Sequence, residues 1–306
     1  MGSLDKRGAH GTNLQHREWA AMSRRSPGVT AGPEQTIGLI AGNGPLPILF
    51  AREALARGFT LVAVGHQGET SESLEGLVTS MDWVRVGELD ALIRILRSHG
   101  VTQAVMLGGI DKERAIKGLF LDERASKLLR DMASRGDDRL LSALARELER
   151  EGIEVRGFKE FVPSWIAPLG CVNARRPTAR ELLDLRLGIK VLAHLGPMDI
   201  GQTVVVKEGV VLAVEAVEGT DRTISRGGQL GGPGGVVIKG SKPTQDLRFD
   251  LPTVGPETVK TMSSVGATLL AVEAGCTVMV ERDEMVSAAD RRGISILGWS
   301  REVVYG

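Results

Sequence analysis

The sequence predicts an α/β protein with two domains: a parallel sheet with helices on both faces, followed by a separate α/β (α+β) domain. The chain has 306 residues, of which 42% are hydrophobic and 25% charged, which is enough for two ordinary cores. In the first half, short apolar runs alternate with amphipathic helical patterns, which is typical of a parallel sheet. Residues 163–177 are irregular and punctuated by proline, which is typical of a domain junction.

These patterns divide the chain into four segments. Residues 1–35 are polar and aperiodic, so we expect a disordered leader, with Met22 as an alternative start. We expect an N-terminal domain over 36–162, a linker over 163–177 and a C-terminal domain over 178–306.

The elements of the first domain follow from apolar runs and their boundaries. The run TIGLIAGNGPLP predicts a strand that breaks into a glycine-rich turn, followed by a helix that ends near Gly58. Further strands are expected at 60–65, 83–86 and 103–109, and helices at 88–100, 113–134 and 138–150, after which the run IEVRG closes the domain.

The second domain begins with a helix. Thr178 and Glu181 form a capping box, and leucine and isoleucine then recur at helical spacing until Gly196. Residues 203–219 read as a hairpin around Lys207-Glu208-Gly209, and a helix is expected near Pro256. We expect the glycine-rich stretch 226–235 to be a mobile loop that could close over an anion; an ordinary solvated loop is the alternative.

Charge and composition exclude several kinds of protein. Lys plus Arg and Asp plus Glu number 38 each, so no global positive field draws the chain to nucleic acid. The two cysteines have no metal spacing and fit free thiols in a reducing compartment. No apolar run is long enough for a membrane helix and the leader lacks a signal-peptide core, so we expect a cytoplasmic protein. Any metal would take oxygen ligands.

The first candidate contact is Gly42-Asn43-Gly44, because ligands of such sheets bind at the carboxyl ends of the strands, where helix N-termini point free amides at anions. A dinucleotide fingerprint would need a third glycine where Pro47 stands, which argues against an NAD-dependent dehydrogenase. Two interpretations stay open, a tight turn that needs glycine for its backbone angles and a contact to phosphate or sugar.

The second candidate region carries the chemistry. From residue 221 to 248 the chain has five cations, Arg222, Arg226, Lys239, Lys242 and Arg248, against the acids Asp221 and Asp246. Lys239 precedes Gly240, whereas a P-loop requires lysine after glycine, so an ATPase is excluded.

Asp250 lies in this cationic region, shortly before the expected helix at Pro256. Both features favour an ionised carboxylate, which suits Mg²⁺ ligation or orientation of water. Asp221 is a second carboxylate that the fold could bring alongside, with a turn or N-cap residue as the alternative interpretation.

Three motifs then carry a resemblance to a known family. IGLIAGNGPLP, DIGQTVVVKEGVVLAVEAVEGTDRTISRGG and KPTQDLRFDLPTVGPETV resemble the UDP-2,3-diacylglucosamine pyrophosphatases of the LpxI type, over about residues 36 to 300. The resemblance implies a Rossmann-like N-terminal domain and a catalytic C-terminal domain, with substrate held between them. It also implies Mg²⁺-dependent hydrolysis, Mn²⁺ being an alternative, of UDP-2,3-diacylglucosamine to UMP and lipid X in lipid A biosynthesis.

The resemblance and the local chemistry together suggest a set of site residues. The family's essential acids fall on Asp250 and Asp221, which we expect to be catalytic and to hold the metal, and whether Asp250 is a base or a metal ligand stays open. Candidate substrate contacts are Gly42, Asn43, Gly44, Pro45, Leu46, Thr220, Arg222, Lys239, Lys242, Gln245, Arg248 and Thr253.

The rival hypothesis is a non-catalytic protein that binds a nucleotide sugar or a lipid phosphate. It explains the glycines and cations equally well, but it does not explain two acids beside a phosphate site, since carboxylates without a cation repel the ligand. We expect at most peripheral contact with the inner membrane. The sequence leaves open a homodimer and the preferred acyl-chain length.

Overall fold

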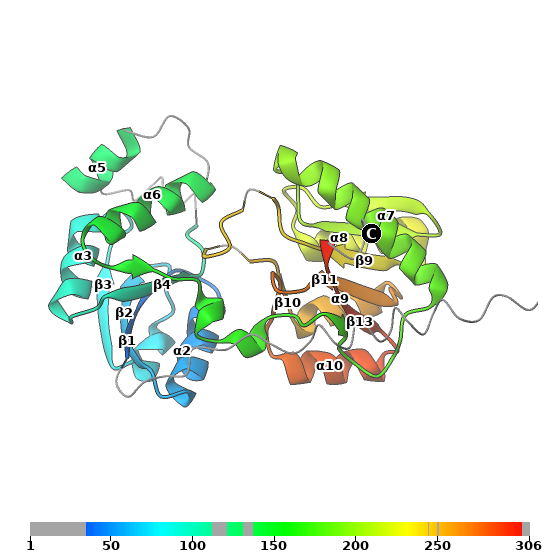
Figure 1. Cartoon of the computed structure of the whole chain (residues 1–306), viewed down its shortest axis with the longest axis horizontal. Coiled ribbons are helices and arrows are strands. Elements are labelled where there is room, and N and C mark those ends of the chain that lie inside the picture. Colours follow the sequence, from blue (N-terminus) through cyan, green and yellow to red (C-terminus); the bar gives the residue numbers. More distant parts are fainter. Residues whose placement is uncertain (1–34, 112–120, 131–136, 244, 250, 302–306) are drawn as a thin grey trace, which may run out of the picture. The chain divides into compact units, whose positions relative to one another are not determined.

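The computed structural model describes residues 35–111, 121–130, 137–243, 245–249 and 251–301 (Figure 1). The chain divides into two compact units. Among these residues, the N-terminal unit comprises 35–163 together with 246–249, and the C-terminal unit comprises 164–245 and 251–301. A short piece of the second half of the sequence therefore belongs to the first unit.

The N-terminal unit is built on a parallel five-stranded sheet of order β3-β2-β1-β4-β5. Its strands are β1 (Thr36–Ala41), β2 (Thr60–His66), β3 (Ser80–Val84), β4 (Gln103–Leu107) and β5 (Glu154–Val155). Its helices are α2 (Leu46–Ala56), α3 (Leu89–Ser98), α5 (Glu123–Arg130) and α6 (Asp137–Arg150), with short 3₁₀ turns η1 (Glu72–Leu77) and η2 (Phe158–Glu160). The Rossmann-like parallel sheet predicted from the sequence is confirmed.

One face of this sheet packs against α3, α5 and α6, whose buried apolar side chains meet Ile40, Val62 and Val64. Phe50 of α2 is fully buried, and its ring lies edge-on to that of Phe161, with the centroids 6.4 Å apart. These layers hold the carboxyl end of β1 and the start of α2 on a rigid base.

The C-terminal unit is built on a mixed six-stranded sheet of order β6-β13-β11-β9-β7-β8. Strands β9 (Val236–Lys239), β11 (Leu269–Glu273) and β13 (Ser295–Trp299) are parallel to one another. The hairpin strands β7 (Thr203–Lys207) and β8 (Val210–Val214), and the edge strand β6 (Gly170–Cys171), are antiparallel to their neighbours. A second sheet pairs β10 (Thr253–Val254) with β12 (Val278–Met279).

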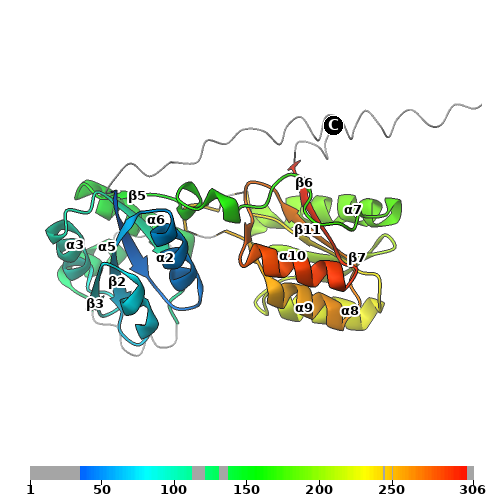
Figure 2. The same ribbon diagram turned by 90° about the horizontal axis from the view of Figure 1, so that it is seen from below.

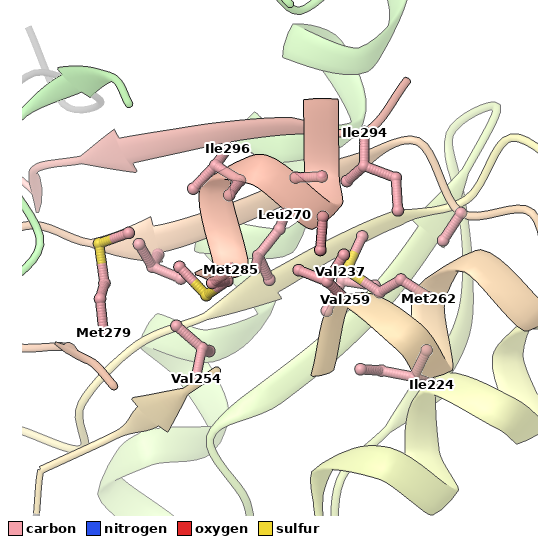
Figure 3. Packing of buried hydrophobic residues seen from close by; sticks show 14 of the residues in the cluster. Ile224, Val237, Val254, Val259, Met262, Leu270, Met279, Met285, Ile294 and Ile296 are labelled. Carbon is pink, nitrogen blue, oxygen red and sulfur yellow. The ribbon is translucent and has the colours of Figure 1, made fainter. Parts of the chain in front are cut away.

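Helices cover both faces of the six-stranded sheet. Figure 2 shows α7 (Ala179–Leu195) on one face and α8 (Thr220–Gly231), α9 (Pro256–Ser264) and α10 (Arg282–Arg291) on the other. Figure 3 shows the core of the second face, where Ile224, Val259 and Met285 from these helices meet Val237, Leu270 and Ile296 from the strands. The remaining 3₁₀ turns are η3 (Pro163–Trp165) and η4 (Gly196–Met198).

Several expected elements are confirmed. Thr178 and Glu181 form the capping box of α7, the hairpin turns at residues 207–209, and α9 begins at Pro256. Of the expected helix 113–134, residues 113–120 and 131–134 lie outside the described residues, as do residues 1–34 of the expected leader. None of the described helices is both long and apolar enough to cross a membrane.

The expected mobile loop at 226–235 is wrong in its first half, because α8 continues to Gly231. Its glycines are close-packing positions. A Cβ atom on Gly227 would lie 2.8 Å from Val205, and one on Gly228 would lie 2.2 Å from Val265. Glycine lets this helix approach β7 and the end of α9 more closely than any other residue would.

Candidate functional site

The glycine turn after β1 packs backbone to backbone against a second glycine turn after β4. The amide of Gly42 donates to the Leu107 carbonyl (2.8 Å), and Asn43 and Gly109 exchange two hydrogen bonds, of 2.7 and 3.3 Å. A Cβ on Gly42 would lie 2.2 Å from the Gly109 oxygen, and one on Gly108 would lie 2.4 Å from the Asn43 oxygen. Gly42 and Asn43 thus have a structural task, whatever they contact in a ligand.

The next residues open toward solvent. Gly44 and Pro45 are exposed, and Gly44 has a positive φ of 86° and nothing within 4 Å of a built Cβ. Helix α2 then starts at Leu46 with no side chain capping its first amides. An uncapped helix start beside an open glycine is a surface that can take an anion. Pro47 is buried in the first turn of α2.

Two polar residues at and after the end of β2, His66 and Glu69, complete this edge of the sheet, and sequence reasoning missed both. Glu69 accepts hydrogen bonds from the Asn43 side chain (2.9 Å) and the Asp111 amide (2.9 Å). His66 Nδ1 lies 2.9 Å from the Ala41 carbonyl, and burial lowers the pKa of its imidazole against the opposing effects of that hydrogen bond and of Glu69. Their signal in the sequence was a polar run, HQGET, directly after an apolar strand.

In the C-terminal unit, the structure brings together two residues that the sequence analysis proposed separately. Lys239 ends β9 and is only 5% exposed; its Nζ donates to Thr220 Oγ1 (2.5 Å) in the first turn of α8. Thr220 Oγ1 in turn donates to Glu215 (3.2 Å). This network places an ammonium group beside the N-terminus of a helix, and both favour a negatively charged ligand.

Asp221 and Arg222 follow Thr220 in the same turn, and both are exposed. The N-cap residue of α8 is Gly219, whose φ is 81° and which offers no side-chain cap. The hairpin was expected to run to residue 219, two residues before Asp221, but β8 ends at Val214. Asp221 lies in the first turn of α8, where an acid also interacts favourably with the helix dipole. Its carboxylate faces solvent and can take a ligand there.

Three other proposed contacts, Lys242, Gln245 and Thr253, make hydrogen bonds within the C-terminal unit. Lys242 Nζ lies 2.5 Å from the Asp199 carboxylate, and Lys242 N donates to the side chain of the buried Gln245 (3.1 Å). Thr253 Oγ1 donates to the Leu251 carbonyl (3.0 Å) at the start of β10. These contacts shape the chain on both sides of residue 250.

Glu273, which the sequence analysis missed, holds the backbone at Ser241, directly before Lys242. Glu273 ends β11 and is 5% exposed; its Oε2 accepts from the Ser241 amide (2.7 Å) and hydroxyl (2.8 Å), and its Oε1 accepts from Arg301 Nε (2.7 Å). Arg301 also donates to the Ser241 carbonyl (2.5 Å). No local pattern marks Glu273, because its partners are 32 and 28 residues away in sequence.

Arg248 belongs to the N-terminal unit, where it forms ion pairs with Asp246 (2.9 Å) and with Glu149 of α6 (2.9 Å). Hydrogen bonds from Arg248 hold the pKa of Asp246 below its ordinary value. Asp250, the principal acid expected from the sequence, lies outside the described residues.

The positive charge expected from residues 221–248 is partly neutralised by ion pairs with acidic side chains. Arg226 pairs with Glu218 (2.5 Å), Lys242 with Asp199, and Arg248 with Asp246 and Glu149. Most of these acids lie outside the 221–248 window in which the charges were counted. Lys239 Nζ contacts Thr220 in the first turn of α8 and Arg222 belongs to the same turn, so the described geometry favours these two as the cations at this helix start.

Among the described residues, the start of α8 offers one carboxylate, Asp221, as a donor for a divalent cation. No three His, Cys, Asp or Glu side chains in the described part of the chain are grouped to hold a metal ion. Mg²⁺ is usually bound by only one or two carboxylates, with phosphate oxygens and water as the other ligands. Asp221, an exposed carboxylate in the residue after Thr220, which binds the Lys239 ammonium, is such a donor.

Comparison with known proteins identifies the family. The model of the LpxI N-terminal domain matches residues 36–165, and that of the LpxI C-terminal domain matches residues 168–297. A curated relative, the UDP-2,3-diacylglucosamine pyrophosphatase LpxI of Caulobacter vibrioides, is 33% identical over 273 residues, covering 86% of this chain and 96% of the relative. The matches span both structural units, and the chain belongs to the LpxI family.

Proposed function

We propose that this protein hydrolyses the pyrophosphate bond of UDP-2,3-diacylglucosamine in lipid A biosynthesis, releasing UMP and 2,3-diacylglucosamine 1-phosphate. Family membership supports the activity, since the relative from Caulobacter vibrioides is a UDP-2,3-diacylglucosamine pyrophosphatase. The observation that carries the chemistry is the hydrogen bond between Lys239 and Thr220 at the uncapped start of α8.

The residues of α8 and β9 would bind and polarise the pyrophosphate. The Lys239 ammonium and the first amides of α8 neutralise phosphate oxygens, and they stabilise the charge that grows on the departing UMP phosphate. Glu215 holds the Thr220 hydroxyl that receives Lys239, which fixes the position of the ammonium.

Water attacks the phosphorus nearer the sugar, and the bond from that phosphorus to the bridging oxygen breaks, so UMP leaves with the bridging oxygen. Asp250 either accepts the proton of this water or orients it as a metal ligand. Asp221 and Asp250 are the residues that would hold Mg²⁺, which when bound supplies Lewis-acid polarisation of a phosphoryl oxygen.

Release of UMP from the diacylated substrate tests the proposal. We expect turnover with Mg²⁺ or Mn²⁺ that stops with EDTA. Asp250→Asn should lower kcat by about 10²-fold or more with little change in thermal stability, because the isosteric amide removes only the charge. Asp221→Asn should also lower kcat.

Glu257→Gln is the matched control, since Glu257 is likewise an exposed acid in the first turn of a helix, α9. It should leave turnover unchanged. No turnover with either metal, combined with tight binding of the substrate, would favour the non-catalytic binding protein instead.

A further inference from the structure

Residues 246–249 form a single turn that is attached to the N-terminal unit. The Phe249 amide donates to the Asp246 carbonyl (3.1 Å), which closes the turn. The Phe249 side chain packs against the core formed with α3, α5 and α6. The backbone of the turn passes close to Gly157, where a built Cβ would be 3.6 Å from Arg248 Cα. The turn thus rests on this unit through both backbone and side chain.

Arg248 makes the polar contacts of this attachment. On one side its Nε and Nη2 donate to the Asp246 carboxylate, at 3.1 and 2.9 Å. On the other side its Nη1 donates to Glu149 Oε1 (2.9 Å) and, at 3.5 Å, to the Val155 carbonyl. Its guanidinium carbon also lies 4.9 Å from the centre of the Phe249 ring. One side chain therefore connects the turn to both α6 and β5.

This arrangement bears on whether Arg248 binds substrate. A cation that binds phosphate needs donors that are free to turn toward the ligand, whereas here two carboxylates already share the guanidinium. Hydrogen bonds to these carboxylates, that to Asp246 first, raise the pKa of Arg248 above its ordinary value. A phosphate would have to displace at least one of them.

We propose that Arg248 is a positioning residue, which holds the backbone directly before Asp250 on the N-terminal unit through its ion pair with Glu149. This inference rests on the proposed function, in which Asp250 is the catalytic acid. Loss of the pair would let the turn detach and would lower the fraction of molecules with Asp250 in place, so kcat should fall while the substrate's KM stays nearly unchanged.

Exchange of the two charges tests the pair. Arg248→Glu and Glu149→Arg should each lower kcat roughly fivefold or more, the upper range for an exposed ion pair. The double variant should recover to within about threefold of wild type, because the arginine introduced on α6 can then face both the new glutamate of the turn and Asp246. Arg146→Glu, a charge reversal at another exposed position of α6, should leave kcat unchanged and is the matched control.

Arg248→Lys provides a milder second variant. Lysine keeps the charge but cannot reach carboxylates on two sides, so we expect partial loss of kcat, whereas a simple phosphate contact would tolerate lysine. Thermal melting of each variant shows that it is folded. If the double variant stays as slow as Arg248→Glu and binds UMP more than about tenfold more weakly than wild type, Arg248 contacts the nucleotide phosphate and the proposal is overturned.

Hydrogen exchange separates this inference from the proposed function. The Phe249 amide should exchange faster in Arg248→Glu than in wild type, and protection should return in the double variant, whether or not the protein hydrolyses the substrate. If the wild-type protein is inactive but shows this exchange pattern, the proposed activity is rejected and the proposed attachment of the turn by Arg248 is supported. Unchanged exchange in Arg248→Glu would reject the attachment even if the enzyme is active.

Discussion

Replacing Gly42 with alanine should force apart the two glycine turns of the N-terminal unit. The new Cβ would lie 2.2 Å from the Gly109 oxygen, and ordinary contacts begin near 3.4 Å, so one turn must move by about 1.2 Å. A displacement of that size breaks the two hydrogen bonds that Asn43 exchanges with Gly109. These bonds contribute about 1 kcal/mol each, and overpacking costs about 1–3 kcal/mol more.

The expected loss is thus about 3–5 kcal/mol of unfolding free energy, which for a unit of this size lowers Tm by roughly 10 °C or more. Gly44→Ala is the matched control two residues away. It meets nothing within 4 Å, and only its positive φ disfavours alanine, by about 1–2 kcal/mol. Calorimetry of the three proteins measures the difference. If Gly42→Ala melts at the same temperature as Gly44→Ala, the backbone packing between the two glycine turns is not the reason why position 42 requires glycine.

Two further predictions concern the ionisable groups of the two units. Lys239→Met keeps the buried aliphatic part of the side chain but removes the ammonium group that donates to Thr220. We therefore expect kcat/KM for UMP release to fall by about 10²-fold. A decrease of less than about threefold would exclude Lys239 from phosphate binding. Burial lowers the folded-state pKa of His66, so the unfolded chain takes up a proton first as the pH falls below the ordinary value of 6.5. Stability should therefore decline with falling pH in that window. Thermal melting should show less of this decline in His66→Gln than in the control His99→Gln, and equal declines would contradict the assignment.

Several helix and turn boundaries of this fold could be predicted from local sequence patterns, and the structure confirms them. The capping box at Thr178, the hairpin turn at Glu208 and the helix start at Pro256 each depend on residues that are neighbours in sequence. The glycines of α8 show where this reasoning stops. In the sequence, Gly227 and Gly228 suggest a flexible loop. In the structure, glycine is needed at both positions because Val205 and Val265 pack directly against the helix, and no local pattern reveals these partners, which are distant along the chain.

The residues of the candidate site likewise include some that the sequence could predict and some that it could not. Lys239 could be proposed from the local group of cations and Thr220 from the motif that carries the family resemblance, and the structure places Lys239 at the end of β9 and Thr220 at the start of α8. Glu69 and Glu273 could not, because a lone glutamate in a polar run or at a strand end has no pattern of its own. Only the structure shows that each accepts several hydrogen bonds and fixes a segment of the site.

Counting charges along the sequence overstated the number of cations available to an anionic ligand. Arg226, Lys242 and Arg248 are close to Arg222 and Lys239 in sequence, yet each of the three is neutralised by an acid brought in by the fold. The affinity of a site for phosphate depends on the charge that remains after such pairing, since a paired cation must first give up its partner. Lys239 differs in its position, because the Thr220 hydroxyl holds its ammonium in the first turn of α8, where the amides of the helix also attract an anion. A lysine held at a helix start can therefore act on a pyrophosphate together with the amides of that helix.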